Sequence, residues 1–236
     1  MSKCFFYVFL LAIIFHPTWT DIGCNTHATI LRQLEREGFH IDIHSLVELV
    51  VDIEKASQWE NCSLVLRESI PDSFYVDPDQ LFELKRTGIL QACTTDTVNI
   101  ETPQHLSKSH TVYVYGRFQR SQNLIYSHLK FPLHLRYQEP KIGGGYSTAV
   151  LKSPHLMIRC KDSIGCKNIV KSKAPCFFCN HSNCSWMRFP YKTNSHNFTV
   201  SVPVGDLNHL PFVTVVTYLL TYGGGFYVLS SLANYN

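Results

Sequence analysis

The chain has 236 residues, with 21 Lys and Arg against 18 Asp and Glu and a formal net charge of +3. This near balance, without a long basic block, argues against a nucleic-acid-binding protein, and the short basic run at 171–173 is typical of a solvated loop. About 185 residues lie between the two apolar ends, enough for one domain with its own core.

The first twenty residues have the pattern of a secretory signal peptide. Lys3 precedes an uncharged apolar run of twelve residues that ends at Phe15. Such a run is too short to span about 30 Å of hydrocarbon at about 1.5 Å per residue. We therefore predict a signal peptide at residues 1–20, cleaved near Thr20, followed by a lumenal domain at residues 21–207.

Cysteines and glycosylation sequons agree with secretory entry. Nine cysteines include Cys4 in the signal, and the even number that remains predicts disulfides in an oxidising compartment. The disulfide candidates are Cys24, Cys62, Cys93, Cys160, Cys166, Cys176, Cys179 and Cys184. The candidate N-glycosylation sites are Asn61, Asn180, Asn183 and Asn197, of which Asn180 and Asn183 are too close for both to be reliably modified. Four sequons favour a eukaryotic secretory chain over the bacterial lipoprotein that DIGC weakly resembles.

The start of the domain has the pattern of a helix followed by a strand. In residues 28–38 the apolar side chains share a helical face, and Gly38 stands where a helix would end. From Phe39 the period changes to two. Phe39, Ile41 and Ile43 are expected in the core, and His40, Asp42 and His44 in water. A metal site built on His40 and His44 is the alternative, but histidines on an exposed strand face are more often solvated.

Residues 62–88 combine a strand, a turn and a short helix. The turn is expected at residues 71–72, and the helix runs through Leu81 and ends at Gly88. Asp77 or Asp79 is expected to cap this helix. A catalytic pair of these two carboxylates is the alternative, although no positioned partner is evident.

Three further segments alternate with a period of two and are rich in aromatic and β-branched residues: residues 97–103, 110–119 and 124–140. Several strands joined by turns predict a mainly β fold. We expect an antiparallel β-sandwich-like domain with one or two short helices.

The segment FPLHLRYQEPKIGGGY, residues 131–146, contains the residue types of an active site, and its pattern favours a strand followed by a turn. Leu133, Leu135 and Tyr137 are expected to face the core, with His134 and Arg136 outward and free to meet a partner. The flanking Pro132 and Pro140 indicate an edge strand. A phosphate loop at 143–145 is the alternative, but such a loop normally leads into a helix and a strand pattern follows here.

Residues 160–184 hold five of the cysteines and are expected to form an irregular loop fixed by disulfides, with one cysteine pairing back to Cys24, Cys62 or Cys93. Zinc bound by Cys176 and Cys179, with another cysteine pair or a histidine, is one alternative. A thiol oxidoreductase built on the same two cysteines is another, although the segment lacks the usual βαβ context.

The C-terminal residues 210–232 contain no charged residue or histidine and are long enough to span a bilayer as a helix. Residues 233–236 would then be a cytosolic tail. Because three glycines interrupt the segment, a buried strand pair with a glycine turn is an alternative. A signal for attachment of a GPI anchor is another, since such signals also place an apolar stretch at the C-terminus.

Four segments together resemble the PIG-X family: FPLHLRYQEP with the following GGGY, GFHIDI, CSLVLRESIPDSFYVDPDQL and PHLMIRC. The likeness runs from about Gly38 to Trp186 and continues through the C-terminal segment in layout only. Its most specific parts are YVDP and the pattern of proline, histidine, arginine and tyrosine at 132–140.

The resemblance implies a single-pass type I protein of the endoplasmic reticulum membrane that stabilises PIG-M, the first mannosyltransferase of GPI-anchor assembly. It implies no catalysis, no catalytic or metal-binding residue and no cofactor in this chain, and it makes His134, Arg136 and Tyr137 candidates for partner contact. The alternative function is a disulfide-rich, glycosylated binding module at the cell surface, itself GPI-anchored.

Overall fold

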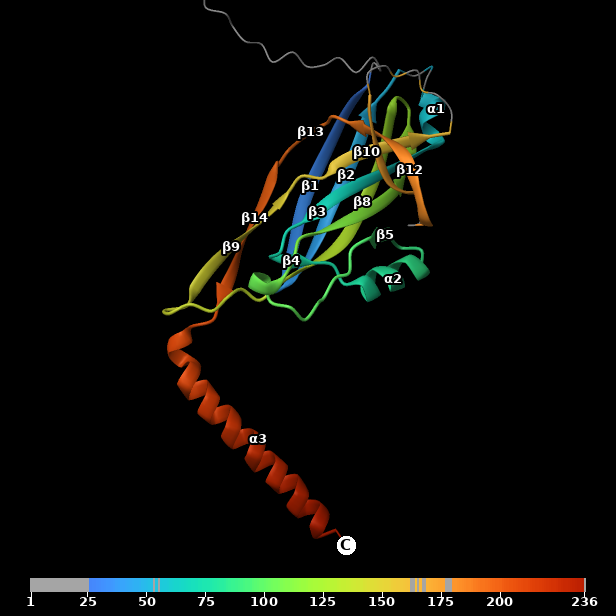
Figure 1. Cartoon of the computed structure of the whole chain (residues 1–236). Helices are drawn as coiled ribbons and strands as arrows, with labels where there is room; N and C mark the ends of the chain where they lie inside the picture. Colours follow the sequence, from blue (N-terminus) through green and yellow to red (C-terminus); the bar gives the residue numbers. More distant parts are fainter. Residues whose placement is uncertain are drawn as a thin grey trace, which may run out of the picture.

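The computed structural model describes residues 26–52, 54, 56–161, 164, 166, 169–176 and 180–235, without the side chains of residues 180 and 181. The predicted signal peptide, Cys24 and Cys179 lie outside these residues. The described part is mainly β, as the sequence predicts, and one long helix follows the last strand (Figure 1).

The first sheet is built around three long antiparallel strands. In spatial order it contains β13 (Lys192–Thr193), β1 (His27–Glu37), β2 (His40–Val50), β8 (Leu124–Leu135) and β4 (Phe74–Tyr75), and β7 (Gln119–Ser121) also pairs with β8. Neighbours are antiparallel apart from β1 and β13.

The second sheet is antiparallel throughout. Its order is β11 (Val170–Cys176), β12 (Asn180–Phe189), β10 (His155–Cys160), β3 (Cys62–Ile70), β6 (His110–Arg117) and β5 (Gln91–Thr94). A separate ribbon pairs β9 (Gly145–Lys152) with β14 (Asn197–Val204). The helices are α1 (Ala56–Glu60), α2 (Pro78–Arg86) and α3 (Leu210–Ala233), with short 3-10 turns η2 (Gln104–Leu106) and η3 (Leu207–His209).

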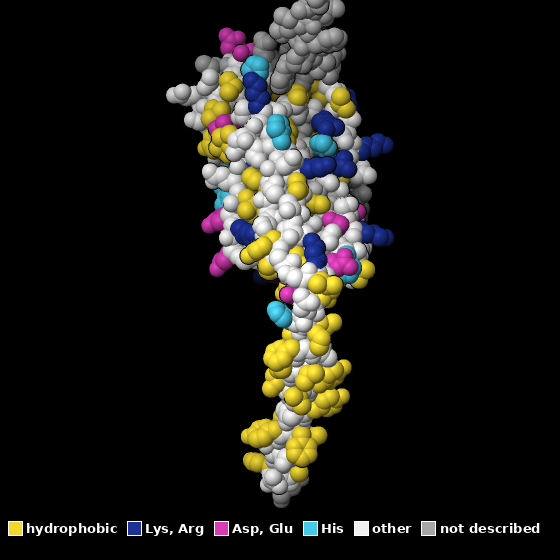
Figure 2. All heavy atoms as spheres, turned by 90° about the vertical axis from the view of Figure 1, so that its left-hand side faces the viewer, with side chains coloured by type: hydrophobic (Ala, Val, Ile, Leu, Met, Phe, Trp, Pro, Cys, Tyr) yellow, Lys and Arg dark blue, Asp and Glu magenta, His cyan; other side chains and the backbone are white. Residues whose placement is uncertain are grey.

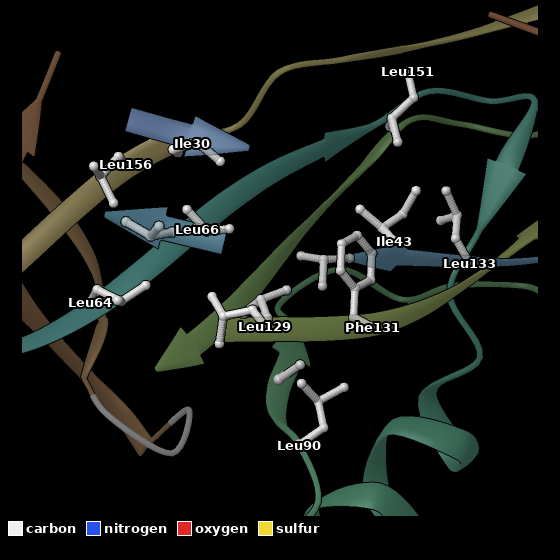
Figure 3. Packing of buried hydrophobic residues seen from close by; sticks show 14 of the residues in the cluster. Ile30, Ile43, Leu64, Leu66, Leu90, Leu129, Phe131, Leu133, Leu151 and Leu156 are labelled. Carbon is white, nitrogen blue, oxygen red and sulfur yellow. The ribbon is translucent and has the colours of Figure 1, made fainter. Parts of the chain in front are cut away.

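The main core lies between the two large sheets, which makes the domain sandwich-like. Figure 3 shows Ile43, Phe131 and Leu133 of the first sheet in the same cluster as Leu64 and Leu66 of the second. All five side chains are withdrawn from water. Burial of apolar area on this scale is the main force that holds two such sheets together.

Residues 28–37 lie in strand β1 and Gly38 follows it, so the helix predicted at 28–38 is wrong. Ala28, Ile30 and Arg32 are buried at every second position, and β1 pairs with β2 along its whole length. Gly38 has a φ of +60° and sits in the two-residue turn between Glu37 and His40. A glycine with positive φ is common both at the end of a helix and in a hairpin turn, so Gly38 was compatible with either structure. Pairing of β1 with β2 selects the hairpin.

The helix at 78–86 is confirmed, and its cap is Asp77. The Asp77 carboxylate accepts hydrogen bonds from the backbone N–H groups of Asp79 and Gln80 at 2.9 and 3.4 Å. Leu81 is the buried residue of this helix, and Gly88 follows its end with a φ of +75°. The expected turn before it is also present, since the N–H of Phe74 donates to the carbonyl of Pro71.

Two strand predictions are corrected. Residues 97–103 form no strand and run as an irregular segment. The other correction concerns β8, which lies between β2 and β4 instead of at an edge. The N–H of Leu135 donates toward β2 and that of Arg136 donates toward β4. Successive backbone N–H groups of a strand point to opposite sides, so the nitrogen of Pro132, four residues before Arg136, also faces the β4 side. On that side β8 pairs with β7 before Pro132 and with β4 after it, and neither strand lies opposite Pro132 itself. The N–H that proline lacks is therefore not needed for a hydrogen bond of the sheet.

Candidate interaction surface

His134 lies on the outer face of the first sheet in a cluster of rings. Its Nε2 is 2.9 Å from Oε1 of Gln80, which ties β8 to α2. Its ring stacks on Tyr75 with centroids 5.0 Å apart and meets His40 edge-on at 4.9 Å. Burial, followed by the neighbouring His40, lowers the pKa of His134. This face therefore presents a mostly neutral, partly exposed aromatic cluster at its β4 end.

Arg136 is buried, which corrects the prediction that it faces outward. Its side chain is 4% exposed, and Nη1 donates to the carbonyls of Thr102 at 2.6 Å and Ile100 at 3.4 Å. The guanidinium also lies over the ring of Tyr75, 4.8 Å from its centroid. Arg136 therefore holds the irregular segment before η2 against the sheet, a structural task that the alternation of the strand did not predict.

Tyr137 is 74% exposed, so the prediction that it faces the core is also wrong. Strand β8 ends at Leu135, and beyond that point the alternation no longer fixes which side a residue faces. The ring centroids of Tyr137 and Phe39 are 5.1 Å apart. The backbone carbonyl of Tyr137 accepts a hydrogen bond from the N–H of Gln104. Leu133 and Leu135, within the strand, are buried as expected.

The rest of this outer face carries one ion pair and two histidines that lie beside carboxylates. Asp42 lies 2.9 Å from Nζ of Lys130 and 3.4 Å from Nε2 of His40, and His44 lies 3.3 Å from Glu35. His40, Asp42 and His44 are on this outer side of β2, as predicted, while Ile41 and Ile43 are in the core. Within the described ranges, no group of three or more potential ligands is placed to hold a metal ion.

Two disulfides are described completely. Cys62 of β3 bonds to Cys160 of β10, which confirms that a cysteine of the 160–184 segment pairs back to one of the three expected partners. Cys176 bonds to Cys184 across the hairpin of β11 and β12. Cys93 and Cys166 are also disulfide-bonded. Residues 170–176 and 180–184 of the segment pair as two strands, which corrects the expectation of an irregular loop for this described part.

The pairing of Cys176 with Cys184 contradicts the two other readings of the cysteine segment. A zinc site or a redox pair built on Cys176 and Cys179 would need the Cys176 thiolate. That sulfur is already bonded to Cys184. The alternatives of a zinc ribbon and a thiol oxidoreductase at these positions are therefore wrong.

Three of the four sequon asparagines are accessible. Asn61 lies in the turn before β3, Asn183 on β12 and Asn197 at the start of β14, and all three are exposed. The side chain of Asn180 is outside the described part. All three positions are open to attachment of a glycan.

The glycines at 143–145 form a turn, as predicted, and this turn is joined to the chain just before α3. All three have positive φ, and Gly145 is already the first residue of strand β9. The N–H of Gly143 donates to Oδ1 of Asp206 at 2.9 Å, and backbone hydrogen bonds join Lys141 to Gly205 and to Leu207. The N–H of Asn208, and to a lesser degree that of Gly143, lowers the pKa of Asp206.

Helix α3 is apolar on all sides and stands clear of the domain. Residues Leu207–Ala233 have a mean hydropathy of 1.5 and none of their apolar window is buried. In Figure 2 the helix carries apolar side chains along the visible face, and no charged side chain appears on it. By length and composition it is a candidate membrane span, and it is a helix instead of the alternative strand pair.

The fold and surface together define a disulfide-bonded β-sandwich with a C-terminal apolar helix. The sequence profile of the family described as PIG-X / PBN1 matches residues 36–233, and the chain belongs to this family. No solved structure matches it.

Three relatives of this chain share the same name. The human protein "GPI alpha-1,4-mannosyltransferase I, stabilizing subunit" is 31% identical over 217 residues, which cover 89% of this chain and 83% of the human one. The rat and mouse proteins of the same name are each 32% identical over 197 residues, covering 81% of this chain and 77% and 76% of their own length.

Proposed function

We propose that this chain is a non-catalytic subunit that stabilises a GPI α-1,4-mannosyltransferase I. The observation that carries the proposal is a similarity that extends through the sandwich and into α3, to relatives named for this role. The physical logic is mass action. A partner that binds only the folded enzyme raises its stability, by about 2.7 kcal/mol when its free concentration is about 100 times the dissociation constant.

The finer features follow as part of the same proposal. The catalytic partner is a PIG-M-type mannosyltransferase, and the chain is a type I protein of the endoplasmic reticulum membrane with its β domain in the lumen. The apolar N-terminal run and the apolar α3 support this orientation. The disulfides fit an oxidising lumen. A GPI-anchored cell-surface module is not favoured, since the named relatives have a different role.

The proposed contact surface is the ring cluster at the β4 end of the outer face, with Tyr137 beside it. Tyr137 offers a large exposed ring, and His134 offers a partly exposed one held by Gln80. Aromatic residues dominate the energetics of many protein interfaces. Arg136 contributes from below by fixing Tyr75 and the neighbouring segment, so its effect on contact is indirect.

Co-purification tests the stabilising role. The tagged chain, solubilised in mild detergent, should recover a mannosyltransferase, and deletion of the chain should lower both the amount of that enzyme and the display of GPI-anchored proteins. Failure to recover the enzyme, together with normal display after deletion, would refute the proposal.

The contact surface has its own matched variants. Tyr137→Ala and His134→Ala should weaken recovery of the enzyme, and truncation at a central interface residue typically costs about 2 kcal/mol or more. Val170 of β11, 66% exposed, and the exposed His128 of β8 are the controls, and Val170→Ala and His128→Ala should leave recovery unchanged. Equal recovery of the enzyme by all four variants would show that the contact lies elsewhere.

Orientation and location need a separate measurement. Glycans on Asn61, Asn183 or Asn197 that endoglycosidase H removes, together with protection of the domain from protease in sealed microsomes, are the expected results. Release of the mature chain from intact cells by phosphatidylinositol-specific phospholipase would instead support the GPI-anchored alternative.

A further inference from the structure

We propose that the end of the β domain from which α3 emerges rests on the bilayer, with Ile142 and Tyr146 entering the headgroup layer. The ligand of this surface is the lipid itself. The inference depends on the proposed membrane span of α3 and adds a second, peripheral contact between the domain and the same membrane.

Exposed apolar side chains gather at this end. Before α3, the seven most exposed large apolar side chains in the described part are Phe82, Ile89, Leu106, Tyr137, Ile142, Tyr146 and Val170. All but Val170 lie on α2, on η2, in the turn after α2 or in the stretch from the end of β8 to the start of β9. Figure 1 places α2, β4 and the start of β9 toward the lower part of the body, and α3 leaves at its lower left and passes beneath.

Ile142 and Tyr146 are the members of this group closest to α3 along the hydrogen-bond network. They flank the glycine turn and are 80% and 74% exposed. Lys141 makes hydrogen bonds to Gly205 and Leu207, and Gly143 donates to Asp206. The turn is therefore fixed to the residues that lead directly into the helix, and its position follows that of α3.

The length of the apolar span sets the depth of this turn. The candidate span Leu207–Ala233 has 27 residues. At about 1.5 Å per residue it measures about 40 Å, against about 30 Å of hydrocarbon. The excess lies in the headgroup layers. Because Lys141 is hydrogen-bonded to the first residue of the span, the neighbouring Ile142 is held at that depth on the side of the β domain.

The chemistry of the turn suits a lipid interface. Tyrosine is enriched at membrane–water boundaries because its ring is apolar and its hydroxyl remains hydrated. Lys141 is exposed and can extend its ammonium group to lipid phosphates, as lysines near membrane surfaces do. The backbone N–H of Gly143 is hydrogen-bonded to Asp206. It therefore keeps its partner when this turn enters the headgroup layer.

Tryptophan quenching tests the proposal with the full chain in phosphatidylcholine nanodiscs whose acyl chains carry bromine close to the headgroup. Ile142→Trp and Tyr146→Trp replace exposed side chains, where substitution rarely disturbs folding. Their added emission should fall about twofold or more in the brominated lipid. The native Trp59 and Trp186 are buried and provide a background measured in the unsubstituted chain.

Two control positions make every outcome informative. Val170, 66% exposed, begins β11, which pairs with β12. Figure 1 draws β12 at the upper right of the body, away from α3, so the emission of Val170→Trp should not change. Tyr218→Trp, within α3, should be quenched by bromine placed deep in the acyl chain. If the Trp at 218 is quenched but those at 142 and 146, like the one at 170, are not, the membrane span stands and the contact of this end with the bilayer is refuted. That result is expected if a protein covers this end. Absence of quenching at 218 would refute the span and the inference together.

Discussion

Arg32 of β1 and Glu68 of β3 form an ion pair inside the sandwich, with Nη2 2.8 Å from Oε1 and both side chains shielded from water. The pair joins the two large sheets within a core that is otherwise largely apolar. Arg32 also donates to the carbonyl of Lys152 at 3.3 Å and lies over the ring of Phe198. Burial raises the pKa of Glu68, and the charge of Arg32 opposes that rise.

Removal of one partner of this pair should cost more than removal of both. Arg32→Met or Glu68→Leu alone leaves a buried charge without its partner, which costs about 3–5 kcal/mol. The double variant removes both charges and should lose less stability than either single variant. Unfolding of the full chain in mild detergent measures the cycle, and a coupling energy below about 0.5 kcal/mol would show that the two sites act independently.

Arg136 and Tyr137 should respond in opposite ways to truncation. Arg136→Ala removes charged hydrogen bonds to two carbonyls and should lower the free energy of unfolding by about 2 kcal/mol or more. Tyr137→Ala, on the surface, should change it by no more than about 0.5 kcal/mol. Leu135→Ala is the reference for core loss at about 2–5 kcal/mol. The same unfolding assay compares them, and an unaffected Arg136→Ala protein would contradict the buried placement.

The two described disulfides should differ in their contribution to stability. Cys62 and Cys160 are 98 residues apart, whereas Cys176 and Cys184 are 8 apart. In the chain-entropy account a longer closed loop gives more stability, about 4.7 kcal/mol for a loop of about 100 residues against about 3 for one of about 15. Paired alanine replacements, compared by urea unfolding, should therefore cost more at 62 and 160. The reverse order would indicate that native-state contacts outweigh loop length.

Alanine should be tolerated less well at Gly144 than at Gly143. Both have positive φ, where a Cβ costs about 1–2 kcal/mol. At Gly144 the added Cβ would also lie 3.2 Å from Cβ of Asp206 and 3.3 Å from the carbonyl oxygen of Val204, whereas at Gly143 it meets open space. Hydrogen exchange at the Leu207 amide should accelerate more in Gly144→Ala. Equal exchange in the two variants would show that the junction with α3 does not depend on this close approach.

The domain should lose stability as the pH falls below 6.5, partly through His110. Burial, followed by the charge of Arg136, lowers the pKa of His110 from 6.5, while Lys108 and Asp96 act in the opposite direction. The backbone N–H of Val76 lies 3.4 Å from Nε2 of His110, an arrangement that needs the unprotonated nitrogen as acceptor. A lowered folded-state pKa means that this stabilisation is complete above pH 6.5 and is lost as the pH falls through the lowered value.

His110→Gln keeps an acceptor for Val76 but cannot titrate. Its melting temperature should therefore fall less than that of the parent chain when the pH drops from about 7.5 to about 5.5. His134→Gln is the comparison, since His134 also has a lowered pKa but is less buried. An unchanged pH dependence in His110→Gln would assign the acid sensitivity to other groups.

Local patterns in the sequence determined a large part of this protein. The alternation in β2 and β8, the Asp77 cap of α2, the turn glycines at 143–145 and the apolar α3 all agree with the structure. Each depends on a periodicity, a cap or a composition that lies within a few neighbouring residues. The mainly β class follows from the same signals.

Only the tertiary structure decided what depends on a partner distant in the chain. Residues 28–37 form a strand because pairing with β2 across the hairpin turn at Gly38 gives hydrogen bonds and burial that an isolated helix could not match. Arg32 and Glu68 occupy inward positions of their strands, and neither pattern revealed that each would neutralise the other. Arg136 is buried and Tyr137 is exposed because β8 ends at Leu135, after which carbonyls of the segment before η2 decide where the guanidinium goes. Cysteine pairing is likewise set by strand neighbours, such as the ladder that places Cys62 opposite Cys160, and spacing along the sequence cannot supply it.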